Sequence, residues 1–165
     1  MRAVDLLRCN FEQTEALTMP IFEDLREMPL AAATPGGNQA LWIFGHLTYC
    51  EGLIARQFLL GVPNELDAWA PTLGPGSRPE EDLELYPSWD EIVANFRQAR
   101  DRTLAWLATQ EDEDLDLPCL QPPEGMDMFF PNRGVGLSIV ISHWWNHRGQ
   151  LCDIRKTLGR SPIFR

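Results

Sequence analysis

The sequence predicts an all-α protein, a four-helix bundle with long connecting loops. Four segments of roughly 20 residues carry apolar side chains at the alternating three-and-four spacing of an amphipathic helix. No alternating apolar run is long enough for a sheet, and the content of 44% hydrophobic and 23% charged residues is typical of a globular protein. Since the chain has 165 residues and no internal repeat or linker between two cores, we expect one domain over residues 1–165.

The first predicted helix is marked by a seam of side chains three and four residues apart. The seam comprises Val4, Leu7, Phe11, Thr14, Thr18, Ile21, Leu25 and Met28. Pro20 lies inside this pattern, and an interior proline costs about 3 kcal/mol because it removes a backbone hydrogen bond and clashes with the preceding turn. We therefore expect a kink at Pro20, with two shorter helices as the alternative.

The second predicted helix begins after Gly36-Gly37-Asn38, where the asparagine side chain can cap the first free amides. It continues through His46 to Leu53 and beyond. Gly61 and Pro63 then end it, because glycine favours the left-handed conformation that closes a helix and proline cannot continue one.

The third and fourth predicted helices have clear start signals. Ser88-Trp89-Asp90-Glu91 has the pattern of a capping box. The apolar face that follows comprises Trp89, Ile92, Val93, Phe96, Thr103 and Leu107. The fourth helix starts near Val135, after Asn132-Arg133-Gly134, and ends at Gly159 with Pro162 beyond.

Two long connections, residues 61–87 and 111–134, are rich in proline, glycine and acidic groups. Loops of this length in a compact domain often serve as lids or crossover connections. We expect both to roof a site at one end of the bundle. Trp69, an aromatic residue in an otherwise polar loop, is a candidate cover for that site, with burial in the core as the alternative.

Charge and cysteine usage limit the partners of the protein. The 14 basic and 24 acidic residues give a formal net charge of −10, which repels nucleic acid. The four cysteines lack C-x-x-C spacing, the amino terminus lacks a secretory signal, and no apolar run approaches the ~18 residues of a membrane span. We expect a cytoplasmic protein that acts on a small-molecule substrate, without a nucleic-acid or membrane partner.

The three histidines are the strongest chemical signal. His143 and His147 are four residues apart, so their side chains lie on one face of a helix and can converge on one ion. His46, on another predicted helix and among apolar residues, is the one histidine left to supply a third ligand. The alternatives are an exposed pair and a hydrogen-bonded core histidine. Trp144 stands where the H-E-x-x-H motif of zinc proteases has its glutamate, so the general base of a protease is missing.

Two motifs resemble the DinB-like superfamily, also called the DinB/YfiT-like metalloenzymes. The first is the run from Gly37 to Leu47, which ends in Gly45-His46-Leu47, and the second is His143-Trp144-Trp145-Asn146-His147-Arg148-Gly149-Gln150. The resemblance extends over essentially the whole chain. It implies a four-helix bundle in which His46, His143 and His147 bind a divalent metal, most commonly zinc or nickel.

A site with three histidine ligands leaves a coordination position open, as in catalytic rather than structural zinc centres. An open position can hold water or a thiolate and lower its pKa toward neutrality. Cys50, four residues after His46, is a possible fourth ligand that would close the centre. Its alternative role is that of a small apolar side chain in the bundle core.

Three residues near the histidine pair are candidates for supporting roles. Gln150, three residues after His147, could orient an imidazole or a bound water, and helix capping or core pairing is the alternative. Asn146 is a similar candidate. Arg148 could hold an anionic substrate at the mouth of the site or be a surface charge near the end of its helix.

Three functions compete at this stage. The first is a metal-dependent transferase or hydrolase, because members of the resembled superfamily include hydrolases and S-transferases and isomerases that use low-molecular-weight thiols. The second is a non-catalytic metal-binding or stress-response module whose metal is structural. The third, a DNA-associated protein, is disfavoured by the negative charge. Since many such bundles pair through their helices, a homodimer is also expected.

Overall fold

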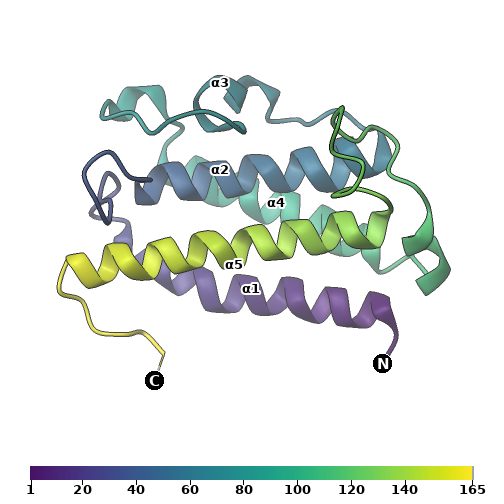
Figure 1. The fold of residues 1–165 in the computed structure, drawn as a ribbon. Helices are drawn as coiled ribbons and strands as arrows, with labels where there is room; N and C mark the ends of the chain where they lie inside the picture. The colour runs from purple at the N-terminus through teal and green to yellow at the C-terminus, as the bar shows by residue number, and fades with distance from the viewer. Residues whose placement is uncertain (165) are drawn as a thin grey trace.

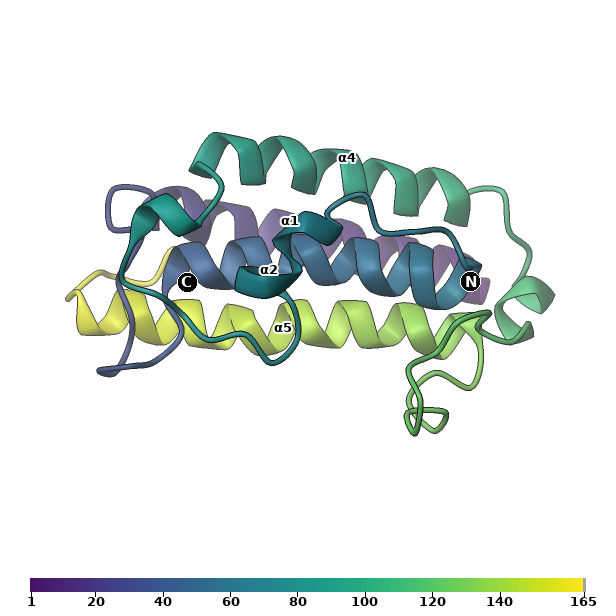
Figure 2. The same cartoon turned by 90° about the horizontal axis from the view of Figure 1, so that it is seen from above.

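The computed structural model describes residues 1–164. Its long helices are α1 (Ala3–Leu25), α2 (Ala40–Gly52), α4 (Trp89–Leu107) and α5 (Arg133–Thr157), and they lie side by side as a bundle (Figures 1 and 2). Residues 1–164 form no β-strand, only an isolated bridge between Ala32 and Gln39. The predicted all-α class is confirmed. Within the same residues, no helix combines the length and apolar character needed to cross a bilayer.

The seam predicted for α1 is buried from Val4 to Leu25, whereas Met28 lies beyond the helix and is 44% exposed. Pro20 lies within one uninterrupted helix, so the alternative of two shorter helices is wrong. Pro20 is exposed. A proline weakens the backbone hydrogen bonding of the turn before it, and in that turn Arg148 of α5 donates to the carbonyl of Leu17. The kink stays a prediction.

All residues of α2 are buried. Gln39, not Asn38, is its N-cap residue, and no side chain caps it. The cap predicted for Asn38 is wrong because α2 begins one residue later; the side-chain amide of Asn38 donates to Gln150 of α5, at 3.0 Å. α2 continues into the π-helical segment η1 (Leu53–Phe58), and the chain then turns at Gly61, whose φ is +66°.

The serine half of the capping box predicted for α4 is confirmed, as is the start signal of α5, but among the described residues the Glu91 side chain accepts no bond from the Ser88 amide. The Ser88 hydroxyl accepts from the Glu91 amide at 3.2 Å, and the Asn132 side chain accepts from the Val135 amide at 2.9 Å. Gly159 follows the end of α5 with φ +70°. The capping residues therefore fix where these two helices enter the bundle.

The core contains a buried ion pair. Arg100 of α4 is 1% exposed and donates through Nε and Nη2 to the two carboxylate oxygens of Glu51 on α2, each at 2.8 Å. A third donation, from Nη1, reaches the carbonyl of Phe11 on α1 at 2.6 Å. One guanidinium thus joins three of the four long helices.

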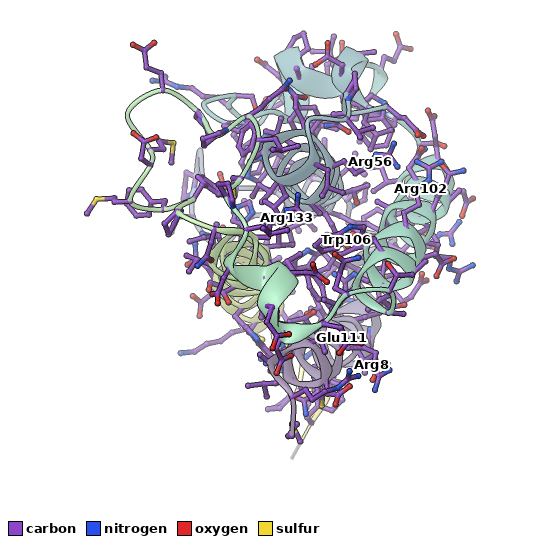
Figure 3. All side chains as sticks on the ribbon, turned by 90° about the vertical axis from the view of Figure 1, so that its right-hand side faces the viewer. Arg8, Arg56, Arg102, Trp106, Glu111 and Arg133 are labelled. Atoms are coloured by element: carbon purple, nitrogen blue, oxygen red, sulfur yellow. The ribbon has the colours of Figure 1, made fainter. Side chains whose placement is uncertain are left out.

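The two long connections cover different parts of the bundle. Residues 61–87 contain η2 (Asp67–Trp69), α3 (Ala70–Leu73) and η3 (Leu83–Leu85), and α3 lies across α2 (Figures 1 and 2). The second connection contains η4 (Asp112–Asp116) beside the start of α1. Figure 3 shows Arg56 and Arg102 close together at the surface, and both pair with Glu65 of the first connection.

Candidate metal centre

The structure brings the three histidines together between α2 and α5. His46 lies midway along α2, and His143 and His147 occupy successive turns near the middle of α5. The Nε2 atom of His143 is 3.2 Å from Nε2 of His46 and 3.0 Å from Nε2 of His147. Two nitrogens bound to one tetrahedral zinc ion, each about 2.0–2.1 Å from it, are about 3.3 Å apart. The cluster therefore has the donor atoms and spacing to hold a divalent metal.

The orientation of His46 depends on a close approach of α3 to α2. Its Nδ1 atom is 2.7 Å from the carbonyl oxygen of Leu73 and donates to it, which leaves the Nε2 lone pair facing His143. Gly45 makes this approach possible, because a Cβ atom at that position would lie 2.7 Å from Cδ1 of Leu73. The Trp42 ring stacks on the imidazole, with centroids 4.5 Å apart and planes at 9°. The ring of His46 is thus fixed from two sides.

His147 is oriented by a polar chain that joins α5 to the start of α2. Its Nδ1 atom is 3.1 Å from Oε1 of Gln150, and the same oxygen accepts from Asn38 at 3.0 Å. An amide oxygen can only accept, so Nδ1 of His147 carries the proton and Nε2 presents its lone pair to the cluster. Gln150 thus stands where a residue that orients a metal-bound imidazole would lie.

Burial lowers the pKa of all three histidines. The pKa of His143 falls to about 3, mainly through burial and further through the neighbouring imidazoles. The pKa of His147 falls to about 4 for the same reasons, although Gln150 opposes the shift. Burial also lowers the pKa of His46, against the effect of its bond to Leu73. At pH 7 the rings are neutral, the protonation state in which imidazole binds metal.

Cys50 lies beside the cluster but is not one of the residues whose donor atoms converge. Its Sγ atom is 3.7 Å from both ring nitrogens of His46. Burial raises the pKa of the thiol to about 12, so the thiol is protonated at pH 7 in the absence of a metal. The residue is 3% exposed, as expected for a small apolar core residue.

A pocket of about 760 Å³ opens beside His46 and His143. Its wall is mostly apolar and is made by Trp42, His46, Cys50, Leu53, Ile54, Phe58, Pro75, Gly76, Pro123, Met126, Phe130, Ile139, Ser142, His143 and Asn146. Both long connections contribute to the wall, as the sequence predicts. The expectation that they roof one end of the bundle is wrong, however, because the histidines lie midway along α2 and α5 and the pocket opens on the flank.

Of the other candidate residues, Asn146 lies at the histidine pocket, whereas Arg148 and Trp69 do not. Asn146 is exposed and lines the histidine pocket. Arg148 is not brought to this pocket, because its Nε atom donates to Leu17 of α1 at 3.2 Å and its guanidinium lies over the ring of Trp145. Trp69 is half-buried against the core and is not part of the pocket wall.

Two functional features are not anticipated from the sequence. One is the carbonyl of Leu73, which carries no residue-specific signal because every residue has one. A glycine directly before a histidine inside an apolar helix does signal a close backbone approach, and Gly45 is such a residue. The other is the π-helical segment Leu53–Phe58, three residues of which line the pocket. Such segments occur often at functional sites.

Comparisons with known proteins agree with this geometry. A family model described as the DinB superfamily matches residues 10–151, which include all three histidines. A search of curated proteins returns no significant match.

Proposed function

Since the chain belongs to the DinB superfamily, we propose that it is a divalent-metal-dependent enzyme that carries out thiol-dependent S-transfer or hydrolysis on a small molecule. The observation that carries the proposal is the convergence of three neutral imidazoles beside an open pocket. Three protein ligands leave a position for a reactant, which is the arrangement of catalytic rather than structural zinc sites.

Each group of the chain has a defined part in this proposal. His46, His143 and His147 hold the metal, while the Leu73 carbonyl and Gln150 keep two of the rings in the tautomer that presents Nε2. A bound ion such as zinc or nickel would supply Lewis acidity and lower the pKa of a water or thiol. The wall of the pocket excludes bulk water from one side of the cluster, which strengthens electrostatic interactions there.

The second candidate is a non-catalytic module with a structural metal. The burial of His46 and His147, which are 7% and 5% exposed, favours it, because a metal there would tie α2 to α5. A structural metal contributes a large share of the folding free energy. If a chelator lowers the melting temperature strongly while no thiol or ester is turned over, this candidate is supported.

Metal binding is tested with protein purified without an affinity tag. Wild type should carry about one divalent ion per chain, and His143→Ala should lose it, since two imidazoles alone bind metal far more weakly. Ser138→Ala is a matched control, because Ser138 lies on the exposed face of α5 and bonds only to its own helix, at the Gly134 carbonyl. Equal metal in wild type and His143→Ala would refute the ligand assignment.

Catalysis is tested with the metal-loaded protein. We expect conjugation of a low-molecular-weight thiol to an electrophile, or hydrolysis of an activated ester, that disappears on chelation and returns when the metal is restored. His143→Ala should abolish the reaction, and Ser138→Ala should preserve it. A fully loaded protein that leaves a broad panel of thiols and esters unchanged would contradict the enzymatic proposal.

A further inference from the structure

A second pocket, of about 440 Å³, lies between the end of α5, α1 and the tail of residues 158–164 that follows α5. The tail turns back toward α1 at Gly159, whose φ is +70° (Figure 1). The wall of this pocket comprises Ile21, Arg148, Cys152, Asp153, Arg155, Lys156, Arg160, Pro162, Ile163 and Phe164. None of these residues lines the pocket beside the histidines, so the two cavities are separate.

The wall of the second pocket is strongly basic. It contains one acidic residue, Asp153, and four basic ones, Arg148, Arg155, Lys156 and Arg160. The whole chain has 14 basic residues against 24 acidic ones, and Lys156 is its only lysine. A local excess of positive charge on a protein with a net charge of −10 directs anions to this part of the surface.

One stripe of α5 supplies three of these cations. Arg155 and Lys156 follow Arg148 by seven and eight residues, the spacing at which side chains share one face of a helix. The guanidinium of Arg148 is held in place by the Leu17 carbonyl, which accepts from Nε at 3.2 Å, and by the ring of Phe164, whose centroid is 5.9 Å from Cζ. The tail and α1 thus fix the position of this cation.

A single carboxylate positions two further cations. Oδ2 of Asp24 accepts from Nε of Arg155 at 2.7 Å and is 2.8 Å from Nη1 of Arg160. Arg155 is only 8% exposed, and among residues 1–164 no acceptor is bonded to its Nη atoms or to those of Arg148. These N–H groups are available to an oxyanion, which accepts hydrogen bonds from guanidinium strongly.

We propose that this pocket binds a small phosphomonoester, with the phosphate at Arg148, Arg155 and Lys156. The two carboxylates at the pocket balance only half of its four cations, and a phosphomonoester carries close to two negative charges at pH 7. Guanidinium groups also match the geometry of phosphate oxygens. Ile163 and Phe164 provide apolar surface for the body of the ligand, and about 440 Å³ is enough for a small organic molecule. The inference is independent of the proposed function.

Phenyl phosphate tests the proposal by isothermal titration calorimetry in phosphate-free buffer of low ionic strength. We expect saturable binding that is at least about tenfold tighter than that of benzoate, which has one negative charge, and that weakens as salt is added. His143→Ala, which removes a ligand of the candidate metal centre, should retain this binding. Absence of binding, equal affinity for benzoate, or loss of binding in His143→Ala would overturn the proposal.

Two exposed cations provide a matched pair of charge reversals. Lys156 lines the pocket, whereas Arg97 lies on α4 and is not part of the wall. Lys156→Glu should weaken binding of phenyl phosphate at least about tenfold, because it places a carboxylate beside the phosphate. Arg97→Glu changes the net charge equally and should weaken binding by about twofold or less, since salt screens distant charges. Circular dichroism verifies the fold of each variant. Equal losses would show that the overall charge attracts the anion, and the proposal would be wrong.

Two cysteines locate the bound probe. Cys152 is exposed and lines the pocket, whereas Cys9 of α1 is half-buried and is not part of the wall. Saturating phenyl phosphate should slow alkylation of Cys152 by iodoacetamide at least about threefold, because the reactivity of a thiol depends on its access to the reagent. Alkylation of Cys9 should be unchanged, and peptide mass spectrometry measures both rates. An unchanged rate at Cys152 would place the probe outside this pocket and refute the proposal.

Discussion

The second nitrogen of an imidazole decides whether the first can bind a metal. His46 and His147 each use Nδ1 as a donor, to the Leu73 carbonyl and to Gln150, so that both present a lone pair at Nε2. These outer contacts come from α3 and from α5 itself, and Asn38 holds Gln150 in turn. The site is therefore ordered before any metal arrives, which reduces the entropy lost on binding.

Substitution of Gln150 tests this arrangement. Gln150→Leu removes the acceptor of the His147 bond and should weaken metal affinity about 10–100-fold, the usual effect of losing such an outer partner. Gln150→Glu is the matched control, because its oxygens can accept from both His147 and Asn38 and should keep most of the affinity. Competition with a coloured chelator measures both. Equal affinities in wild type and the leucine variant would show that Gln150 does not orient the ligand.

Helical spacing accounts for the part of the site that the sequence predicts. Positions three and four apart share a face, so the pair His143 and His147 and the position of Gln150 can be predicted from the sequence. Arg148 fails the same test, because it follows His147 by one residue and is rotated about 100° around the helix, toward α1. The Leu73 carbonyl could not be predicted, since its position depends on how residues 61–87 cross α2.

Helix ends were predictable where the signal is local. Ser88 and Asn132 cap α4 and α5 because each side chain bonds to an amide three residues ahead. Asn38 has the same chemistry but lies one residue before the N-cap position of α2, and its side chain donates to Gln150, on a helix far away in the sequence. The π-helical segment Leu53–Phe58 follows a helix that is buried on all sides, so no change in an apolar stripe marks where the segment begins.

The contact between α2 and α3 depends on the missing side chain of Gly45. In Gly45→Ala the new Cβ would lie 2.7 and 2.8 Å from the two Cδ atoms of Leu73, which is fully buried and has little room to move. Such overpacking should reduce the free energy of unfolding by about 1–3 kcal/mol. It should also weaken metal affinity, because the Leu73 carbonyl moves away from His46. Urea unfolding and chelator competition measure the two effects.

Two further variants control for the helix itself. Gly149→Ala adds a Cβ at an exposed position of α5, with no atom within 4 Å. It should raise the free energy of unfolding by about 0.5–1 kcal/mol, because alanine has a higher helix propensity than glycine. Leu73→Ala combined with Gly45→Ala should recover part of the lost metal affinity, since it removes the clash. A Gly45→Ala variant that behaves like Gly149→Ala would show that the close approach is unimportant.

α1 is capped by a side chain from η4 rather than by its own residues. The two carboxylate oxygens of Asp112 accept from the amides of Val4 and Ala3, each at 3.0 Å, and these bonds lower the pKa of Asp112 below its ordinary 3.8. A lowered pKa in the folded state means that the ionised carboxylate stabilises the fold above pH 3.8. This stabilisation is lost as the pH falls through the folded value.

Asp112→Asn mimics the protonated carboxyl group and should therefore be less stable than wild type at pH 7. The difference in free energy of unfolding should shrink as the pH is lowered below 3.8, because wild type then loses the same charge. Urea unfolding at a series of pH values measures it. Asp116→Asn, at the exposed end of the same short helix, is the control and should show little difference at any pH. Parallel curves for wild type and Asp112→Asn would contradict the capping role.

The bundle as a unit is joined by charge as well as by apolar packing. The apolar seam of α4 passes through Ile92, Phe96 and Thr103, and Arg100 occupies a position in that seam. A charged residue at a seam position signals a buried partner, but Glu51 lies on a helix that is buried on all sides, so no polar face of that helix identifies the partner. The pairing thus follows from tertiary packing.

The homodimer and the cytoplasmic location stay predictions.

Removal of one partner of this pair should be far more damaging than removal of both. Arg100→Met leaves the Glu51 carboxylate buried without a counter-charge and should reduce the free energy of unfolding by about 3–5 kcal/mol. Arg100→Met combined with Glu51→Met replaces the pair by apolar side chains and should recover much of that loss. Urea unfolding of the single and double variants gives the coupling energy between the two residues.

Arg102→Met is the matched control for this experiment, because Arg102 is on the same helix and pairs with Glu65 at the surface. Exposed pairs contribute about 0–1 kcal/mol, so its effect should be small. Raised salt should weaken the Arg102 pair and leave the Arg100 pair nearly unchanged, since ions screen exposed charges much more than buried ones. The Arg100 guanidinium bonds to both Glu51 and the Phe11 carbonyl. If Arg100→Met lowered the free energy of unfolding no more than Arg102→Met does, these bonds would not be what holds α1, α2 and α4 together.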